Sequence, residues 1–395
     1  MRLVLLSTAL YSANSVATHI YAASYAGSVT TLSPQSKNGN YSLSTVAQTN
    51  DCGISPSWLM LDSDHSLMLC LNEGIGATNG SLTSFRTNSN GSLTTLDILE
   101  TMTGPVMSAI YTIPSNSQQR FVAIAHYEAS AVTAYTWNSS TGHLARTQTF
   151  TYQLPAPGPV PDRQDASHPH GVIVDPTGRF VLVPDLGMDR IHIFKISPSN
   201  GHLQPQAPLL VEPGSGPRHA VFWTTSPNKK AASSDDTVLY LVSELGNNLS
   251  AFKPRYTQKG LFFAKMFEEN TYGGKAAPDG SKASGIQITP GNDHVVVSNR
   301  GDATFGKEID SFAVFKCASF HGSRTTNVSF VGLFPAYGSF PREFDINGDN
   351  GKVAVALQNS HAVVLTENNA QTGGPGKLLA RKTLYGEIPI AIWGP

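Results

Sequence analysis

The sequence predicts an all-β protein, a seven-bladed β-propeller whose C-terminal strand completes the N-terminal blade. The first observation is that short runs rich in Val, Ile, Thr, Tyr and Phe fill the chain, and no long apolar stretch with a helical period follows the N-terminus. The second is its length, since 395 residues exceed most single hydrophobic cores but suit a repeat in which each unit packs on its neighbours. The third is the repeat itself.

The repeating unit is clearest between residues 170 and 202. A strand from His170 leads through an Asp-Pro-Thr-Gly turn to a second strand that ends near Asp185, and Ile191–Ile196 alternates as a third strand. A turn rich in Ser, Pro, Asn and Gly precedes a fourth, and four antiparallel strands are typical of a propeller blade. Similar units begin near Pro56, Pro105, Pro169, Pro217, Ser284 and Pro341.

A seventh blade is split between the two ends of the chain. Residues 18–46 supply outer strands that have no innermost strand before them, and Ile388–Trp393 has the innermost-strand pattern. Pairing these segments closes the ring and removes two exposed sheet edges.

Residues 1–17 are expected to be a signal peptide, which leaves residues 18–395 as the propeller. Arg2 begins a positive n-region, an apolar run follows to Ala13, and Ser15-Val16-Ala17 is a small-x-small cleavage site. The apolar run is too short to span a bilayer. A secreted protein is therefore expected, with a buried first strand as the alternative for this segment.

Six Asn-x-Ser sequons fit a glycosylated extracellular surface. They begin at Asn40, Asn79, Asn90, Asn138, Asn248 and Asn327. Cys52 and Cys70 flank one predicted hairpin, where they either form a disulfide or remain separate thiols, and Cys317 is left over.

Three segments are longer than a simple turn. We expect Asn228–Asp236 to be a solvent-exposed loop, and Glu268–Lys282 is an excursion that contains Gly and Lys and precedes the sixth blade. Pro155–Ser167 is rich in proline and leads directly to His168, so we expect it to cover a site.

Comparison of equivalent positions around the ring indicates a polar funnel at one mouth of the channel. The residue after each blade-starting proline begins the innermost strand, and His170, Arg218 and Arg342 stand there, where buried charges are costly without a partner. The ends of the second strands reach the same mouth. The residues assigned to that position, with Arg300 following Asn299, are Asn72, His126, Asp185, Glu244, Asn299 and Gln358.

Three arginines in one funnel predict a small carboxylate or phosphate ligand, because guanidinium groups bind both in a bidentate manner. The alternative is that Glu244 and Asp185 pair with arginines to hold the blades together. The net charge of −1 gives no basic face for nucleic acid. We find no metal-ligand spacing, phosphate loop or Gly-x-Ser-x-Gly elbow, and we expect no cofactor.

Several motifs recur at the blade starts and second strands: DRQDASHPHGVIVDPTGRFVLVPDLGMDRIHIF (Asp162–Phe194), GPRHAVF, LVSELGNNL, VVVSNRGD and FPREFDI with VALQNS. Together they resemble the motifs of the seven-bladed lactonase family, which includes propeller-type 6-phosphogluconolactonase and fungal carboxy-cis,cis-muconate cyclase. The resemblance implies His170, Arg218, Glu244 and Arg300 as catalytic residues. Further residues that match its motifs, expected to bind substrate, are Arg342, Arg163, Gln164 and His168.

The resemblance and the funnel together give a first hypothesis, a cyclase that closes a lactone on a small polycarboxylate. Its alternative is a sugar-lactone hydrolase of the 6-phosphogluconolactonase kind, which would use the same site. A third hypothesis is a non-catalytic secreted antigen or adhesin that binds an extracellular matrix or glycan ligand, since fold does not fix function. The polar funnel favours an enzyme, because an adhesin does not need it.

Overall fold

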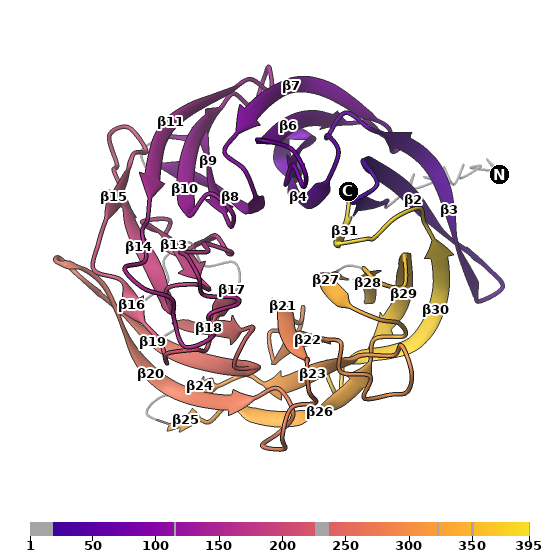
Figure 1. Cartoon of the computed structure of the whole chain (residues 1–395). Coiled ribbons are helices and arrows are strands. Elements are labelled where there is room, and N and C mark those ends of the chain that lie inside the picture. Colours follow the sequence, from indigo (N-terminus) through magenta and orange to yellow (C-terminus); the bar gives the residue numbers. More distant parts are fainter. Residues whose placement is uncertain (1–18, 114–115, 226–236, 322–323, 349–350, 395) are drawn as a thin grey trace, which may run out of the picture.

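The computed structural model describes residues 19–113, 116–225, 237–321, 324–348 and 351–394. Seven antiparallel blades, formed by these residues, surround a central channel (Figure 1); six have four strands, and blade 4 has a fifth short strand. The all-β propeller prediction is confirmed. The predicted signal peptide and the insertion Asn228–Asp236 lie outside the described residues.

The blades are numbered from the one that contains the first strand. Blades 1 to 3 consist of β31 (Ile390–Trp393), β1 (Ile20–Ser24), β2 (Ser28–Lys37) and β3 (Asn40–Thr49); β4 (Pro56–Asp62), β5 (Leu67–Asn72), β6 (Gly80–Thr87) and β7 (Leu93–Thr101); and β8 (Pro105–Ile113), β9 (Asn116–His126), β10 (Ala131–Trp137) and β11 (Leu144–Thr151). A 3₁₀ turn, η1 (Ser63–His65), joins β4 to β5.

Blades 4 to 7 continue in chain order. They consist of β12 (Ile173–Val174), β13 (Phe180–Asp185), β14 (Arg190–Ile196), β15 (Leu203–Pro205) and β16 (Leu209–Leu210); β17 (Pro217–Thr224), β18 (Thr237–Ser243), β19 (Asn248–Thr257) and β20 (Gly260–Asn270); β21 (Lys282–Ile288), β22 (His294–Arg300), β23 (Ser311–Lys316) and β26 (Ser329–Pro335); and β27 (Pro341–Asn347), β28 (Lys352–Leu357), β29 (Ala362–Asn368) and β30 (Pro375–Thr383). A small hairpin, β24 (Ser319–His321) with β25 (Arg324–Thr326), projects from blade 6.

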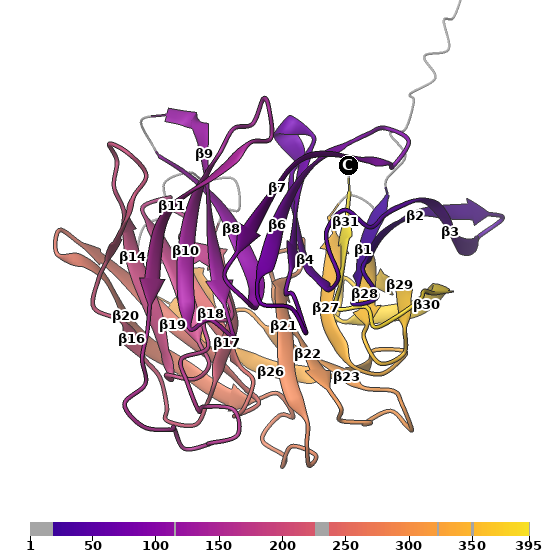
Figure 2. The same cartoon turned by 45° about the horizontal axis from the view of Figure 1, so that its top comes forward.

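The ring closes as the sequence predicts. β31 is the innermost strand of blade 1 and pairs antiparallel with β1, so that Ile20 lies opposite Trp393 (Figure 2). Trp393 also reaches blade 7, where its backbone N–H donates to Asp345 Oδ2 at 2.8 Å and its indole N–H to the Asp345 carbonyl at 3.0 Å. The last strand therefore links blade 1 to blade 7.

The hydrophobic core consists of layers between neighbouring blades. One cluster, for example, joins Ala123 and Val132 of blade 3 to Val181 and Phe194 of blade 4. Equivalent clusters within the described residues join every other pair of adjacent blades. Because each blade packs between two others, its second strand is largely apolar and buried, as in β5 and β18, and burial of each large side chain stabilises the fold by about 1.5–3 kcal/mol.

Cys52 and Cys70 form a disulfide, and Cys317 is a buried free thiol. The bridge fixes the segment that enters blade 2 to the second strand of that blade, which settles the pairing that the sequence left open. Asn248 is half-buried in β19, whereas the other sequon asparagines are exposed.

Two details differ from the sequence-based expectation. The inner strand of blade 4 is regular only over β12, and an isolated bridge between Pro169 and Asp185 extends it toward the channel mouth. The predicted excursion Glu268–Lys282 is shorter, because β20 continues to Asn270 and β21 begins at Lys282.

Candidate active site

A cavity of about 240 Å³ lies at the mouth of the channel where the innermost strands begin. Its lining is mostly charged, and the residues are Glu73, Val106, Tyr127, Glu128, Arg163, His170, Arg218, Glu244, Lys282, Arg300, Phe340 and Arg342. The cavity thus brings together the four predicted catalytic residues with Arg163 and Arg342. The opposite mouth holds a cavity of about 1130 Å³ with a mainly apolar lining that includes Met60, Met107 and Phe222.

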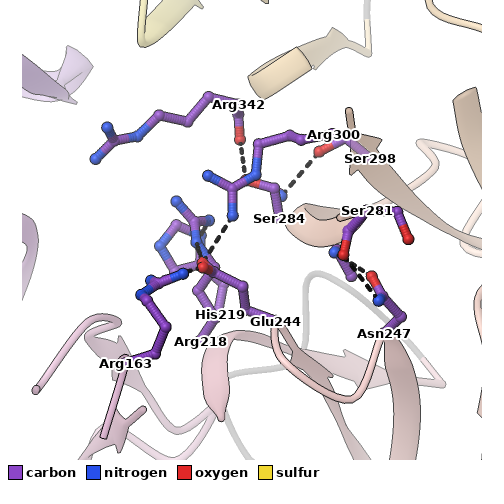
Figure 3. Close-up of polar contacts among 12 residues, drawn as sticks. Arg163, Arg218, His219, Glu244, Asn247, Ser281, Ser284, Ser298, Arg300 and Arg342 are labelled. Carbon is purple, nitrogen blue, oxygen red and sulfur yellow. Dashed lines mark hydrogen bonds and ion pairs between the residues drawn. The ribbon is translucent and has the colours of Figure 1, made fainter. Parts of the chain in front are cut away.

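Glu244 is the centre of the charged group. Its carboxylate is 2% exposed and forms ion pairs with three guanidinium groups. Oε1 lies 2.7 Å from Arg163 Nη2, and Oε2 lies 3.0 Å from Arg218 Nε and 2.7 Å from Arg300 Nη2 (Figure 3). Three positive charges thus surround one negative charge.

Electrostatics keep Glu244 ionised. Burial alone would raise its pKa, but the charges of Arg300, Arg218 and Arg163 outweigh this and hold the pKa far below its ordinary value. Burial and the neighbouring Arg300 lower the pKa of Arg218 to about 10, so this guanidinium is still charged at neutral pH. The group therefore presents a fixed positive surplus to the cavity.

A β-bulge adds two residues that sequence reasoning missed. Pairing between β17 and β18 shifts between Pro217 and His219, which makes Arg218 the extra residue and breaks the alternation of side chains. Arg218 Nη1 and His219 Nδ1 then both reach Glu343 Oε1, at 3.1 and 2.9 Å. The same shift follows Pro341 and precedes Glu343.

His170 lies against the arginines because the backbone next to it is glycine. A Cβ atom on Gly171 would lie 2.5 Å from the Arg218 carbonyl oxygen, so only glycine allows blades 4 and 5 to approach this closely. Burial, Arg218 and His219 together hold the pKa of His170 well below 6.5. The imidazole is therefore neutral, and its buried Nδ1 has no hydrogen-bond partner among the described residues.

Arg342 belongs to a second polar group on the same mouth. Its guanidinium donates to the Tyr25 hydroxyl and lies 3.1 Å from Glu73 Oε1, and Tyr25 itself donates to Glu73 Oε1 at 2.8 Å. Tyr25 and Glu73 were not predicted. They link the ring-closing blade 1 to the site.

The loop Pro155–Ser167 reaches the site, as its position suggested. It carries Arg163, whose ion pair with Glu244 is described above, and Arg163 also donates to the Tyr127 hydroxyl at 3.4 Å. His168 stacks on Tyr127 with ring centroids 4.1 Å apart. Gln164 is fully buried and holds the loop, since its amide donates to the Leu186 carbonyl. Gln164 and His168 thus do not line the cavity.

Phe340 and Lys282 complete the cavity wall. Phe340 has a φ of 63°, a conformation uncommon for a residue with a side chain, and its N–H donates to Asp310 Oδ2 at 2.6 Å. Its ring lies 5.0 Å from the Arg300 guanidinium carbon. The Lys282 ammonium forms no ion pair with the described residues.

Three predicted substrate-binding residues lie one position away from the cavity. In blade 5 the blade-starting proline, Pro217, pairs with Ser243, the residue before Glu244. In blades 2 and 3 the corresponding partner of the proline is Asn72 or His126, so these residues correspond to Ser243 and not to Glu244. A one-residue offset turns a side chain to the other face of a strand. The residues that face the cavity are therefore those one position later in the chain, namely Glu73, Tyr127, Glu244 and Arg300.

The offset residues stabilise turns instead. Asn72 Oδ1 accepts the N–H of Ser55 at 2.8 Å, and His126 lies between the Met102 carbonyl and the Thr133 hydroxyl. Asn299 donates to Ser311 Oγ at 3.0 Å. Gln358, the remaining predicted residue, lines an adjacent cavity.

The described residues contain no helix with the length and apolar character needed to cross a bilayer. In the same part of the chain, no three His, Cys, Asp or Glu side chains come together as metal ligands.

The sequence matches the family described as "Lactonase, 7-bladed beta-propeller" over residues 19–387. The chain belongs to this lactonase family. The motif resemblance to it is thereby confirmed.

Relatives of this chain include a protein named probable 6-phosphogluconolactonase from Arthroderma benhamiae, 32% identical over 395 aligned residues that cover 99% of this chain and 92% of the relative. A Formosa agariphila protein named 6-phosphogluconolactonase is 27% identical and covers 87% of this chain and 90% of its own. The periplasmic gluconolactonase of Pseudomonas aeruginosa has the same fold, with a TM-score of 0.77 at 22% identity, covering 96% of this chain and 99% of that one.

Three buried histidines predict that acid destabilises the protein. Burial lowers the pKa of His126 and of His219 to about 4, and that of His170 well below 6.5. Between pH 6.5 and about 4 the unfolded chain therefore binds more protons than the native protein, and the free energy of unfolding falls as the pH falls. Urea unfolding at pH 7, 6, 5 and 4.5 measures this slope.

A His126→Asn variant is the control for this pH dependence. It removes one of the three histidines, so its slope should be shallower than that of the wild type. A free energy of unfolding that stays constant or rises as the pH falls from 6.5 to 4.5 would contradict the prediction.

Proposed function

We propose that this lactonase hydrolyses an aldonolactone, a sugar lactone of the kind that 6-phosphogluconolactonases open. The observation that carries the proposal is the group of three guanidinium ions on the Glu244 carboxylate, next to a neutral His170, in a cavity of about 240 Å³. Ester hydrolysis passes through a tetrahedral oxyanion, and prearranged positive charge in a partly dry site stabilises it more than any other single device.

Each residue of the site has a separate role in the proposed hydrolysis. Water adds to the lactone carbonyl carbon, and Arg218 and Arg300 stabilise the resulting oxyanion. His170 accepts the proton from the attacking water and gives it to the ring oxygen as the ring C–O bond breaks. The products are a hydroxy acid carboxylate and a proton released to solvent.

The low pKa of His170 suits this role once the oxyanion forms. Burial and the nearby arginines disfavour the imidazolium in the free enzyme. An oxyanion against Arg218 offsets the repulsion from that guanidinium, which makes His170 more basic in the transition state than in the free enzyme. Glu244 stays ionised and acts by holding the arginines in place.

Hydrolysis replaces cyclisation as the leading interpretation. The Arthroderma benhamiae and Formosa agariphila relatives are named 6-phosphogluconolactonases, one of them as probable, which supports a lactone-opening enzyme over a muconate cyclase. A non-catalytic adhesin has no use for the charge cluster, because burying four charged side chains costs free energy without improving a binding surface outside the channel.

Lys282 provides a place for an anionic substituent. The four arginines of the cavity contact Glu244 or Glu73, whereas the Lys282 ammonium forms no ion pair within the described residues. A 6-phosphate on the sugar would neutralise it. We therefore include a phosphorylated lactone among the substrates to be tested.

Secretion is part of the proposal. The Arg2 n-region and the cleavage pattern at Ala17 support export, as do the exposed sequon asparagines and the disulfide between Cys52 and Cys70.

A His170→Asn variant tests the proposed mechanism. Its kcat/KM for glucono-1,5-lactone and for the 6-phosphate should fall by roughly 10²–10⁴, the usual contribution of a general base. His202→Asn makes the same change at an exposed residue and should leave kcat/KM unchanged. Stopped-flow release of protons measures both variants. Wild-type protein that accelerates neither lactone would refute the function, and an active His170→Asn would remove this residue from the mechanism.

A further inference from the structure

The channel mouth holds a second cavity beside the first. It measures about 580 Å³ and lies over blades 7, 1 and 2, and it shares Glu73 and Arg342 with the 240 Å³ cavity. These two residues form an ion pair 3.1 Å long and line both cavities, which are therefore adjacent. A ligand that fills the smaller cavity can therefore continue past this pair into the larger one.

The smaller cavity is below the usual range for small-molecule sites, which is about 300–1,000 Å³. A single sugar ring near Arg218 and Glu244 would occupy most of it. Any substituent that points toward blades 7, 1 and 2 has to lie in the larger cavity.

The chemistry of the larger cavity differs from that of the smaller one. Two carboxylates, Glu73 and Glu387, line it with the amide of Gln358, and Arg342 is its only cation among the described residues. Gln358 Nε2 donates to Glu387 Oε2 at 2.7 Å, and Gln358 Oε1 has no partner in the described part of the chain. These acceptors suit hydroxyl donors and would repel a second anion.

Two apolar side chains stand on the rim of this cavity. Ile54 is 55% exposed and Ile75 is 58% exposed, so both present apolar surface at this cavity. The C–H faces of a sugar ring would cover them while the ring hydroxyls reach the carboxylates. Hydroxyl acceptors with adjacent apolar surface favour a neutral carbohydrate over an anion or an acyl chain.

We infer that the larger cavity is a subsite for a second sugar unit, so that the preferred substrates are aldonolactones carrying a glycosyl substituent. The inference rests on the proposed lactone hydrolysis and names the substrate class. The lactone ring occupies the cavity at Glu244, and the glycosyl unit occupies the cavity at Glu387.

The experiment compares glucono-1,5-lactone with its 4-O-glucosyl derivative. For the wild type we expect kcat/KM to be about tenfold higher for the glucosylated lactone. A Glu387→Ala variant should lose this preference, since the loss of one hydrogen bond to a charged group lowers kcat/KM by about tenfold. Asp64→Ala removes an exposed carboxylate in η1, at the opposite end of blade 2, and should keep the preference.

Binding measurements separate this inference from the proposed function. Calorimetric titration with gluconate and with 4-O-glucosyl gluconate requires no turnover, and the glucosylated acid should bind about tenfold tighter to the wild type but not to Glu387→Ala. Hydrolysis of both lactones at equal kcat/KM, with equal binding of both acids, would refute the second subsite and leave the lactonase function intact. Absence of hydrolysis of both lactones would overturn the proposed function and the assigned substrate class with it.

Discussion

Replacing Glu244 with glutamine should abolish lactone hydrolysis and destabilise the protein by about 3–5 kcal/mol, the usual cost of removing one partner from a buried ion pair. The change keeps the size of the side chain but removes the carboxylate that Arg163, Arg218 and Arg300 share, and leaves Glu343 paired with Arg218. These guanidinium groups would then repel one another in a buried site. Urea unfolding at pH 7 measures the loss of free energy.

An added anion distinguishes this explanation from general misfolding. The uncompensated arginines of Glu244→Gln should bind sulfate or phosphate more tightly than those of the wild type, so either anion should raise the Tm of the variant by more. Glu100→Gln is an appropriate control, because Glu100 is an exposed carboxylate on β7. Unchanged stability of Glu244→Gln would contradict a central electrostatic role for this residue.

Ending the chain at Glu387 should eliminate the cooperative thermal transition. The deletion removes β31 and exposes blade 1, and the lost side chains include Ile388, Ile390 and Trp393, which are 0%, 2% and 8% exposed. Burial of three such residues is worth roughly 5 kcal/mol or more. That amount approaches the net stability of about 5–15 kcal/mol that a typical domain has. Differential scanning calorimetry is the measurement.

A peptide supplied in trans tests whether the effect of the truncation is due to the loss of β31. A synthetic segment 387–394 should pair with β1 and restore part of the transition, whereas the same segment with Ile390→Asp should not, because it places a charge against Tyr21 and Cys52 in the buried cluster between blades 1 and 2. A truncated protein with the full Tm of the wild type would show that β31 does not hold the ring closed.

The sequence alone was sufficient to predict the fold, because a propeller repeats its signals. Each blade begins near a proline or a small residue and turns after its second strand, so the split blade could be recognised from Ile388–Trp393 alone. The short inner strand of blade 4 and the close approach of Gly171 to the Arg218 carbonyl in the next blade could not be predicted, since both depend on contacts between blades.

The charged members of the site were predictable, but their neighbours were not. Strands such as β13 are buried on both faces and apolar throughout, so no alternation marks which residue faces the channel. This is why Asn72 and Asn299 were placed with Glu244, although Glu73 and Arg300 occupy its position. Aligning the blades on their proline pairs would have corrected the offset.

His219 and Glu343 required the structure for a different reason. Each follows an arginine directly, and strict alternation places adjacent residues on opposite faces. The bulges after Pro217 and Pro341 bring both residues into the charged group, and only the pairing register reveals such bulges.

The closure of blade 1 also sets the order in which the protein can be completed during synthesis. Ser24 and Tyr385, which share a hydrogen bond, are 361 residues apart in the chain. β1 therefore leaves the ribosome without its inner partner, and one of its edges stays unpaired until almost all other blades have been translated. Contacts of such long range slow folding, and an unpaired edge favours aggregation in the interval. The N-terminal blade is thus the first to be made and the last to be finished.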